Sequence, residues 1–418
     1  MPAVSPSSAR EGRFQRNDVG RDQVEQDRNI WRSHRGDSDH DGHVCLNPGL
    51  ALLRKWISGG VCYSPARLHR KTVLITGANT GIGKETARDM ARRGPPCGGT
   101  FPAAAPGARV VMACRDLTRG EKAAEEIRSS TGNSEVVVQQ LDLASFASVR
   151  QFAKRYSEQE ERLDILINNA GVMMCPKGLT VDGFETQFAV NHLGHFLLTN
   201  LLLGKLQKST PSRVITVSSL AHKGGKIHFD DLSFSKTTYN SLTSYRQSKL
   251  ANLLFARELA RRLKGGGPHL GHPPRPQYNY THPSHDRTVG PSCFPGKRLV
   301  RKGGAEGIIL SAVCPGSGVM SFALHPGVIR TELGRHVELQ NPLLKVLLYI
   351  PAFLLLKTPW EGAQTSIYCA VTEGLEGKSG SYFSDCALKK PAPEAQDDLV
   401  ALRLWEVSAQ LVGYTQTD

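Results

Sequence analysis

A tyrosine and a lysine four positions apart, Tyr245 and Lys249, are the residues whose chemistry is easiest to state. On a helix this spacing places both side chains on one face. An ammonium group beside a phenol lowers the phenol's pKa, because the cation favours the phenolate. Such a phenol can act as a general acid or base near neutral pH. The same spacing is also common on helix surfaces that have no function, so the pair has to be judged together with the other motifs.

Two serines add a second kind of chemical group. Residues 214–217 are apolar and predict a strand, and Ser218 and Ser219 follow it directly. A hydroxyl at the end of a strand can hydrogen-bond a substrate oxygen. From the residues alone, both serines are candidates for this contact.

A glycine-rich stretch, KTVLITGANTGIG at 71–83, predicts a strand, a sharp turn and the start of a helix. Gly77 allows the turn, Gly81 lets the backbone approach a pyrophosphate, and Gly83 lets the helix pack closely on the sheet. The helix N-terminus then offers N–H groups and a partial positive charge to phosphates. The alternative is a tight turn before a helix that binds nothing.

The elements that must position these residues alternate along the chain. We expect strands at 72–75, 109–113, 136–140, 165–167, 214–217 and 320–324, and helices at 82–93, 117–129, 145–156, 184–206 and 244–263. This alternation indicates an α/β fold, a Rossmann-type doubly wound parallel sheet with helices on both faces. Ligands of such sheets bind at the carboxyl ends of the strands, where all of the motifs lie.

Domain boundaries follow from composition. We expect residues 1–44 to be disordered and 45–70 either to lie on a membrane surface or to pack on the domain, which spans 71–414. No apolar run follows Met1, so we expect no secretory signal. Two stretches, 95–107 and 266–318, break the alternation and are interpreted as loop insertions in a single domain.

Composition argues against several other classes of function. The net charge is +14, but aromatic and basic residues do not interleave as in an RNA-binding surface, so no nucleic acid is expected. The nine cysteines never form C-x-x-C, which argues against a disulfide framework or zinc site. Asp37, Asp39 and Asp41 resemble the opening of a calcium loop, but its twelfth position is Pro48. We therefore expect no metal site.

Taken in order along the chain, the motifs resemble those of the classical short-chain dehydrogenase/reductase family, and within it the microsomal retinol dehydrogenases 11 to 14. The matching stretches are 76–83 (TGANTGIG), 113–116 (ACRD), 168–174 (NNAGVMM), 191–196 (NHLGHF), 245–249 (YRQSK), 325–327 (HPG), 357–359 (KTP), 361–366 (EGAQTS) and 382–386 (YFSDC). The resemblance extends from about residue 54 to 414, apart from the two insertions.

The resemblance implies roles for the individual residues. Tyr245 would exchange the substrate proton, Lys249 would lower its pKa and bind the nicotinamide ribose, Ser219 would polarise the carbonyl, and Asn191 would hold a water relay. The family's active serine is the second of the pair, which favours Ser219 over Ser218. The cofactor would be bound by Gly77, Asn79, Thr80, Gly81, Ile82, Gly83, Asp142, Asn168, Ala170, Gly171, Tyr245, Lys249, Pro326, Gly327 and Thr331.

Arg115 bears on which nicotinamide cofactor is bound. It follows the second expected strand, where an acidic residue would bind the ribose hydroxyl of NAD and an arginine can pair with the 2′-phosphate of NADP. We therefore expect NADP(H). A surface arginine paired with Asp116 is the alternative reading.

The resemblance also implies an oxidoreductase for retinal, retinol or similar long apolar aldehydes and alcohols. Residues 341–356 would form an apolar lid over the substrate, or else a buried core helix. The family suggests a cytosol-facing, peripheral or weakly anchored protein of the endoplasmic reticulum, cytoplasmic if the anchor is lost, and a homodimer. Two other hypotheses are a chain that keeps the fold and the cofactor but has impaired turnover, and a nucleotide-sensing scaffold.

Overall fold

The protein is described from a computed structural model, which covers residues 48–94, 107–264, 317–329 and 356–414. The chain divides into two compact units, Met1–Leu53 and Arg54–Asp418, and the second unit contains the sheet. Several sequence-based expectations lie outside the described residues. These are the segment 1–44 with its aspartates, nearly all of both insertions, Thr331, and the expected lid at 341–355.

An eight-stranded sheet forms the centre of the second unit. Its strands are β1 (Thr72–Thr76), β2 (Arg109–Cys114), β3 (Val136–Gln140), β4 (Ile165–Asn168), β5 (Ser212–Val217), β6 (Val319–His325), β7 (Tyr382–Ser384) and β8 (Ala387–Lys389). Their order is β3-β2-β1-β4-β5-β6-β7-β8. All neighbours are parallel except β7 and β8, which are antiparallel. This arrangement confirms the Rossmann-type expectation and adds β7 and β8 at one edge.

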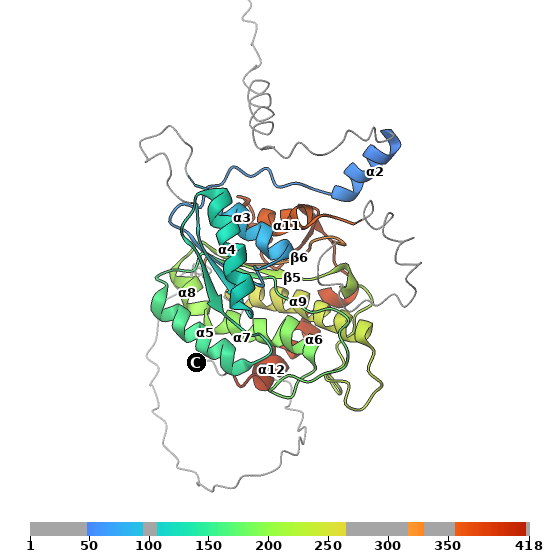
Figure 1. The fold of residues 1–418 in the computed structure, drawn as a ribbon. Helices are drawn as coiled ribbons and strands as arrows, with labels where there is room; N and C mark the ends of the chain where they lie inside the picture. The colour runs from blue at the N-terminus through green and yellow to red at the C-terminus, as the bar shows by residue number, and fades with distance from the viewer. Residues whose placement is uncertain (1–47, 95–106, 265–316, 330–355, 415–418) are drawn as a thin grey trace, which may run out of the picture. The chain divides into compact units, whose positions relative to one another are not determined.

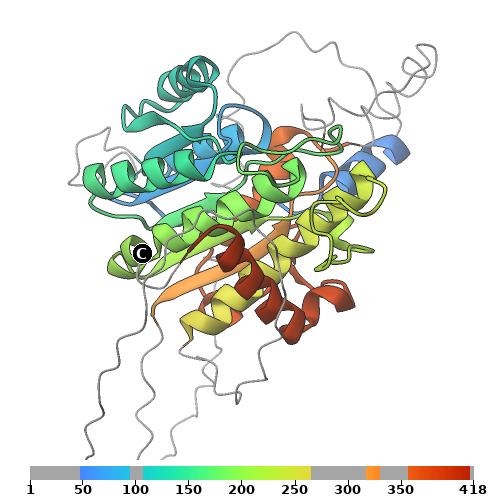
Figure 2. The ribbon, with the colours of Figure 1, turned by 90° about the horizontal axis from the view of Figure 1, so that it is seen from below.

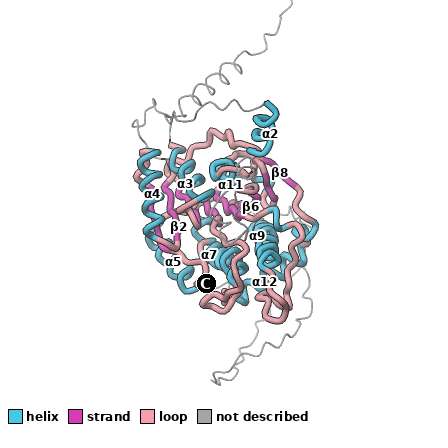
Figure 3. Tube along the Cα trace, turned by 45° about the vertical axis from the view of Figure 1, so that its right-hand side comes forward, coloured by secondary structure: helices cyan, strands magenta, loops and turns pink. Residues whose placement is uncertain are grey.

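Helices cover both faces of the sheet. One face carries α3 (Gly81–Arg92), α4 (Leu117–Thr131) and α11 (Pro359–Val371), and the other carries α5 (Phe146–Gln159), α7 (Gly194–Leu201), α9 (Ser241–Leu263) and α12 (Asp398–Leu411) (Figures 1 and 3). Successive strand residues point to opposite faces. In β1, Val73 and Ile75 therefore join the core of the first face, whereas Leu74 joins that of the second.

The remaining elements are four helices or helical turns and three 3₁₀ turns among the described residues. They are α2 (Pro48–Ser58), α6 (Thr186–Phe188), the π-helical turn η1 (Ala189–Leu193), α8 (Leu203–Lys208), and the 3₁₀ turns η2 (Leu220–His222), η4 (Glu376–Lys378) and η5 (Pro393–Gln396).

The single helix expected over 184–206 is divided into α6, η1, α7 and α8. The Glu185 side chain starts α6 by accepting hydrogen bonds from two backbone N–H groups. In η1, the Asn191 side chain donates to the carbonyl of Val172 at 2.9 Å and accepts from its N–H at 2.8 Å. The wider π turn accompanies this tie to a neighbouring segment. Apolar periodicity does not reveal such a local contact, so the sequence predicted one continuous helix.

At each insertion, a backbone hydrogen bond joins the residues before and after the inserted stretch. The Ala108 N–H donates to the Met90 carbonyl, and the Ser317 N–H donates to the Leu263 carbonyl, each at 3.1 Å. These junctions precede the amino ends of β2 and β6. Figure 2 shows β6 in orange beside α9 in yellow, with which it packs.

The residues that follow Leu53 pack on the domain. The Arg54 guanidinium donates to both carboxylate oxygens of Glu361, at 2.8 and 2.7 Å, and the Ser58 hydroxyl donates to Glu361 at 2.7 Å. Glu361 also closes a capping box with Thr358 at the start of α11. Among the described residues, no helix has the length and apolar character needed to cross a membrane.

Candidate active site

The glycine-rich turn after β1 is shaped for close backbone approach. Gly77 and Gly81 adopt φ of +65° and +57°, which glycine tolerates without strain. A Cβ on Gly83 would lie 2.4 Å from the Gly77 carbonyl oxygen, so no side chain fits there. Asn169 fixes the turn, because its amide donates to the carbonyls of Thr76 and Gly77 at 2.9 and 3.2 Å.

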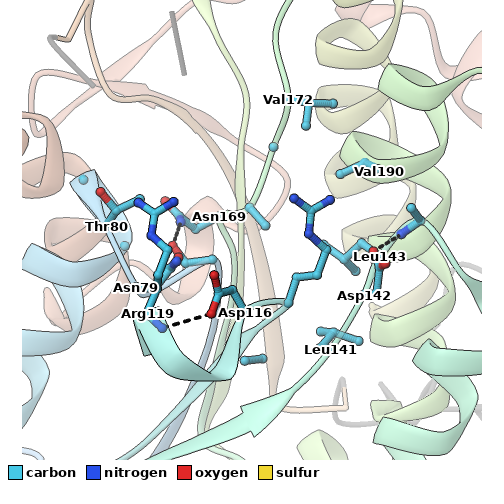
Figure 4. A pocket seen from close by; sticks show the side chains of 18 of the residues that line it. Asn79, Thr80, Asp116, Arg119, Leu141, Asp142, Leu143, Asn169, Val172 and Val190 are labelled. Carbon is cyan, nitrogen blue, oxygen red and sulfur yellow. Dashed lines mark hydrogen bonds between the residues drawn. The ribbon is translucent and has the colours of Figure 1, made fainter. Parts of the chain in front are cut away.

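A pocket of about 310 Å³ lies at the carboxyl ends of the strands β1 to β4 (Figure 4). Ten residues expected from the sequence line it, namely Gly77, Asn79, Thr80, Gly81, Ile82, Gly83, Arg115, Asp142, Ala170 and Gly171. Asn168 is not among its lining residues. It is buried, and its amide donates to the Thr199 hydroxyl at 2.9 Å, whereas the neighbouring Asn169 lines the pocket.

Two arginines line the pocket where β2 meets α4. Arg115 is exposed, and Arg119 lies in the first turn of α4. Asp116 caps this helix by accepting a hydrogen bond from the Arg119 backbone N–H at 3.0 Å (Figure 4). The Asp116 carboxylate is thus the N-cap of α4. The two guanidinium groups give this end of the pocket a positive charge.

Helix α9 carries Tyr245 and Lys249 on adjacent turns, both almost fully buried. The Lys249 ammonium lies 5.7 Å from the centre of the Tyr245 ring and donates to the Val217 carbonyl at 3.2 Å. A Cβ on Gly171 would lie 3.5 Å from the Lys249 Nζ and 3.0 Å from Oδ1 of Asn191. Gly171 also lines the pocket, so this glycine connects the pocket to the tyrosine–lysine pair.

Burial controls the ionisation of this pair. It raises the pKa of the Tyr245 phenol, and a hydrogen bond with the Ser219 side chain acts in the opposite direction. Burial also lowers the pKa of Lys249 to about 8. The expected effect of the lysine on the phenol stays a prediction, because the largest influence on the pKa of Tyr245 here is its burial. The ammonium donates to the Val217 carbonyl, and desolvation of the phenol dominates.

The two candidate serines have different surroundings. The Ser218 hydroxyl is buried and donates to the backbone carbonyl of Lys249 at 2.7 Å. Ser219 is partly exposed, accepts a hydrogen bond from the Ala221 N–H at 3.2 Å, and shares a side-chain hydrogen bond with Tyr245. Ser219 is therefore the serine that accompanies the phenol.

Asn191 is fully buried and ties three segments together. Besides its two bonds to Val172, its amide donates to the Ser248 hydroxyl at 2.9 Å, and that hydroxyl donates to the Tyr245 carbonyl at 2.8 Å. The asparagine thus connects the pocket wall at Val172 with the helical turn that carries Tyr245 and Lys249.

Pro326 and Gly327 follow β6. Gly327 has φ of +100°, and a Cβ there would lie 2.5 Å from the Lys357 side chain, so the position is closed to other residues. Lys357 is itself buried and pairs with Asp385 at 2.5 Å. Pro326 and Gly327 are not among the residues lining the pocket, which ends short of them.

Comparisons with known proteins now decide the family. The short chain dehydrogenase family matches residues 71–264. Retinol dehydrogenase 12 from Bos taurus is 46% identical over 361 residues, covering 86% of this chain and 92% of that one. Retinol dehydrogenase 13 from Homo sapiens is 46% identical over 363 residues, covering 87% and 90%. The chain belongs to the short-chain dehydrogenase family.

A solved structure agrees with this assignment. An uncharacterized protein from Mycobacterium Paratuberculosis matches with a TM-score of 0.56 and 32% identity, covering 84% of this chain and 96% of that one. The resemblance seen in the sequence is confirmed, and the chain is an oxidoreductase of the short-chain type, similar to the retinol dehydrogenases.

The short-chain dehydrogenase pocket also contains residues that the sequence reading missed. The chief one is Arg119, whereas Asn169, which holds the glycine turn, lies within the stretch 168–171 expected to line the cofactor cleft. A signal for Arg119 was present, because a helix starting at Leu117 places this residue in its first turn, beside the end of β2.

Proposed function

We propose that this short-chain dehydrogenase interconverts retinal and retinol, or similar long apolar aldehydes and alcohols, with NADP(H). The observation that carries the proposal is the convergence of Ser219, Tyr245 and Lys249 beside the glycine-lined pocket. When bound, the nicotinamide would supply or accept the hydride at the carbonyl carbon.

In the direction of reduction, Tyr245 gives its phenolic proton to the carbonyl oxygen. The buried phenol is protonated at neutral pH, which is the state that a proton donor requires. The Ser219 hydroxyl holds the same oxygen, and the Lys249 ammonium stabilises the phenolate that remains. Asn191 keeps the helical turn of Tyr245 in register with the pocket wall and supports the relay that returns a proton to Tyr245.

The residues present fit a dinucleotide. Gly77 and Gly83 leave no room for a Cβ, and the turn after Gly77 leads directly into the N-terminus of α3, which contains Gly83. Backbone N–H groups there would hold the pyrophosphate. Asp142 would contact the adenine, Ala170 and Gly171 would line the path toward Lys249, and Pro326 and Gly327 would lie near the carboxamide.

The choice of NADP(H) rests on charge. Arg115 and Arg119 line the same end of the pocket and together offer two guanidinium groups to a 2′-phosphate. An acidic residue that would bind the ribose hydroxyls of NAD is found at Asp116, but its carboxylate caps α4. A phosphate is therefore the better partner for this end of the pocket.

Apolar surface supports the substrate class. Leu220, which follows Ser219, is 46% exposed, and Val328, which follows Gly327, is 59% exposed. Exposed apolar side chains beside the polar reacting groups suit a long hydrocarbon substrate. Two relatives of this chain are named as retinol dehydrogenases 12 and 13, which makes retinal the first substrate to try.

The assay follows directly. Purified protein is incubated with all-trans-retinal and NADPH, or with NADH, and retinol is measured by chromatography, with Tyr245→Phe as the matched control. Formation of retinol by the wild type alone supports the proposal. NADPH binding with no turnover of retinal or other long aldehydes would instead establish the rival reading, a chain that retains the fold but is catalytically impaired.

An exposed tryptophan in α2 bears on membrane association. Trp56 is 80% exposed, and Lys55 beside it is exposed as well. Tryptophan and lysine at one surface suit contact with lipid headgroups. We therefore propose a peripheral membrane contact here. Co-sedimentation with anionic liposomes should fall in Trp56→Ser, and equal sedimentation of the two proteins would rule the contact out.

A further inference from the structure

Two buried histidines contact the turn that follows Ser219. His222 is part of the turn, His325 lies at the end of β6, and they are 0% and 8% exposed. We propose that these histidines are positioning residues, which hold Ser219 at a fixed distance from Tyr245 and from the Pro326–Gly327 loop. This inference rests on the proposed function, in which Ser219 contacts the substrate oxygen.

His222 holds the turn from within. Its Nδ1 lies 2.7 Å from the Ser219 carbonyl oxygen, and its Nε2 accepts a hydrogen bond from the Ala392 N–H at 3.2 Å. Its ring packs edge-on against Tyr382, with centroids 5.1 Å apart. Because a carbonyl can only accept, Nδ1 must carry the proton. The catalytic turn is thereby tied to the segment just before η5.

His325 holds the turn from the other side. It is the last residue of β6, and its Nδ1 lies 3.1 Å from the Leu220 N–H and 3.4 Å from the Gly327 N–H. Both partners are donors, so this nitrogen must be unprotonated. One ring atom therefore joins the residue after Ser219 to the loop expected to face the nicotinamide.

The two rings have opposite tautomers, and each needs to be neutral. A proton on Nδ1 of His325, or on Nε2 of His222, would break the hydrogen bond that this nitrogen accepts from a backbone N–H. Burial lowers the pKa of both groups, to about 4 for His325. The charged groups that act on His325 are Asp385, Lys357 and Lys223, and those that act on His222 are Lys223 and Glu394. Both histidines are thus neutral at physiological pH, which keeps the four contacts intact.

These contacts matter because they connect the short turn of Ser219 to segments outside it. The Ser219 side chain is partly exposed, and its own turn, η2, is only three residues long. Orientation of a reacting group is sensitive to small shifts, and a displacement of about 1 Å can lower a rate about a hundredfold. The hydrogen bonds that His222 and His325 make with this short turn would limit such shifts of Ser219.

The test compares His325→Leu, which removes the acceptor, with His325→Asn, whose Oδ1 can take the place of Nδ1. The first readout is hydrogen exchange, by mass spectrometry, of the peptides that contain the Leu220 and Gly327 amides. We expect faster exchange in His325→Leu and near wild-type exchange in His325→Asn. This readout needs no turnover, so it decides the contact even if retinal is not a substrate.

The second readout is kinetic. In His325→Leu, kcat for retinal reduction should fall about ten- to a hundredfold while the Kd for NADPH changes less than about threefold, and His325→Asn should recover most of the rate. His192→Asn is the control, because His192 is also buried but bonds Ser408 in another part of the core. It should lower the melting temperature without the loss in kcat.

Unchanged exchange at Leu220 in His325→Leu would overturn the proposal, and so would faster exchange with unchanged kcat. If His325→Leu does not fold, His325→Gln replaces it, because its carbonyl cannot occupy the Nδ1 position. If the wild type does not reduce retinal but the variants show the expected exchange pattern, the proposed substrate is wrong and the positioning contact is established.

Discussion

The Ser218 hydroxyl donates a hydrogen bond to the backbone carbonyl of Lys249 at 2.7 Å, inside the core. This bond ties the end of β5 to α9 at the lysine. Ser218→Ala should therefore lower stability by about 1 kcal/mol, the usual net value of such a bond. Ser219→Ala should instead lower kcat about a hundredfold with little change in melting temperature. Thermal melts and retinal reduction separate the two, and the reverse pattern would assign the reaction to Ser218.

Tyr245→Phe should abolish turnover while leaving NADPH binding largely intact. The substitution removes only the hydroxyl that supplies the proton, and the buried ring can remain in place. Steady-state rates and fluorescence titration with NADPH measure the two effects. Wild-type activity in this variant would mean that another group transfers the proton.

Arg115→Asp should weaken NADPH binding about ten- to a hundredfold, because a charge-assisted contact worth about 1.5–3 kcal/mol is replaced by repulsion. NADH binding should change much less. Arg119→Ala tests the second guanidinium in the same way, with a smaller expected loss. Equal losses for both cofactors would contradict the assignment to NADP(H).

Lowering the pH should lower the free energy of unfolding, because buried histidines are neutral in the folded protein. Burial lowers the pKa to about 3 for His192, about 4 for His195 and about 4 for His325. An unfolded histidine titrates near 6.5, so between about pH 6.5 and 4 the unfolded chain binds more protons. Stability is therefore full above pH 6.5 and falls as the pH drops.

Each such histidine contributes a slope of about 1.4 kcal/mol per pH unit within that window. Urea denaturation between pH 7 and 4.5 measures the total. His195→Asn removes one of these contributions. The free energy of unfolding of this variant should therefore change less steeply with pH than that of the wild type. Parallel curves for the two proteins would show that His195 is not neutral in the fold.

Removing both insertions, 95–107 and 266–318, should leave the KM for NADPH nearly unchanged. Their bases lie at the amino ends of β2 and β6, whereas the pocket and Ser219 lie at carboxyl ends. Shortening a loop gains about 0.6 kcal/mol per halving of its length, so melting temperature and soluble yield should rise. A several-fold shift in cofactor affinity would show that an insertion reaches the cleft.

The sequence predicted the sheet well, because most of the strands from β1 to β6 are apolar runs that alternate with helical segments. It also predicted half of the residues that line the pocket, since glycine spacing reflects close backbone approach that no other residue permits. It did not predict η1, where the Asn191 side chain pairs with the backbone of Val172. The pKa of Tyr245 was also beyond reach, because it depends on burial and on where the Lys249 ammonium donates.

The closed bases of the insertions have a practical use. The backbone bonds from Ala108 to Met90 and from Ser317 to Leu263 hold each pair of loop ends together, away from the chemistry. The protein already accommodates an extra stretch of chain at both points. A fluorescent reporter or an affinity tag could therefore be placed at either junction, which would make the enzyme visible in cells without adding anything to either terminus.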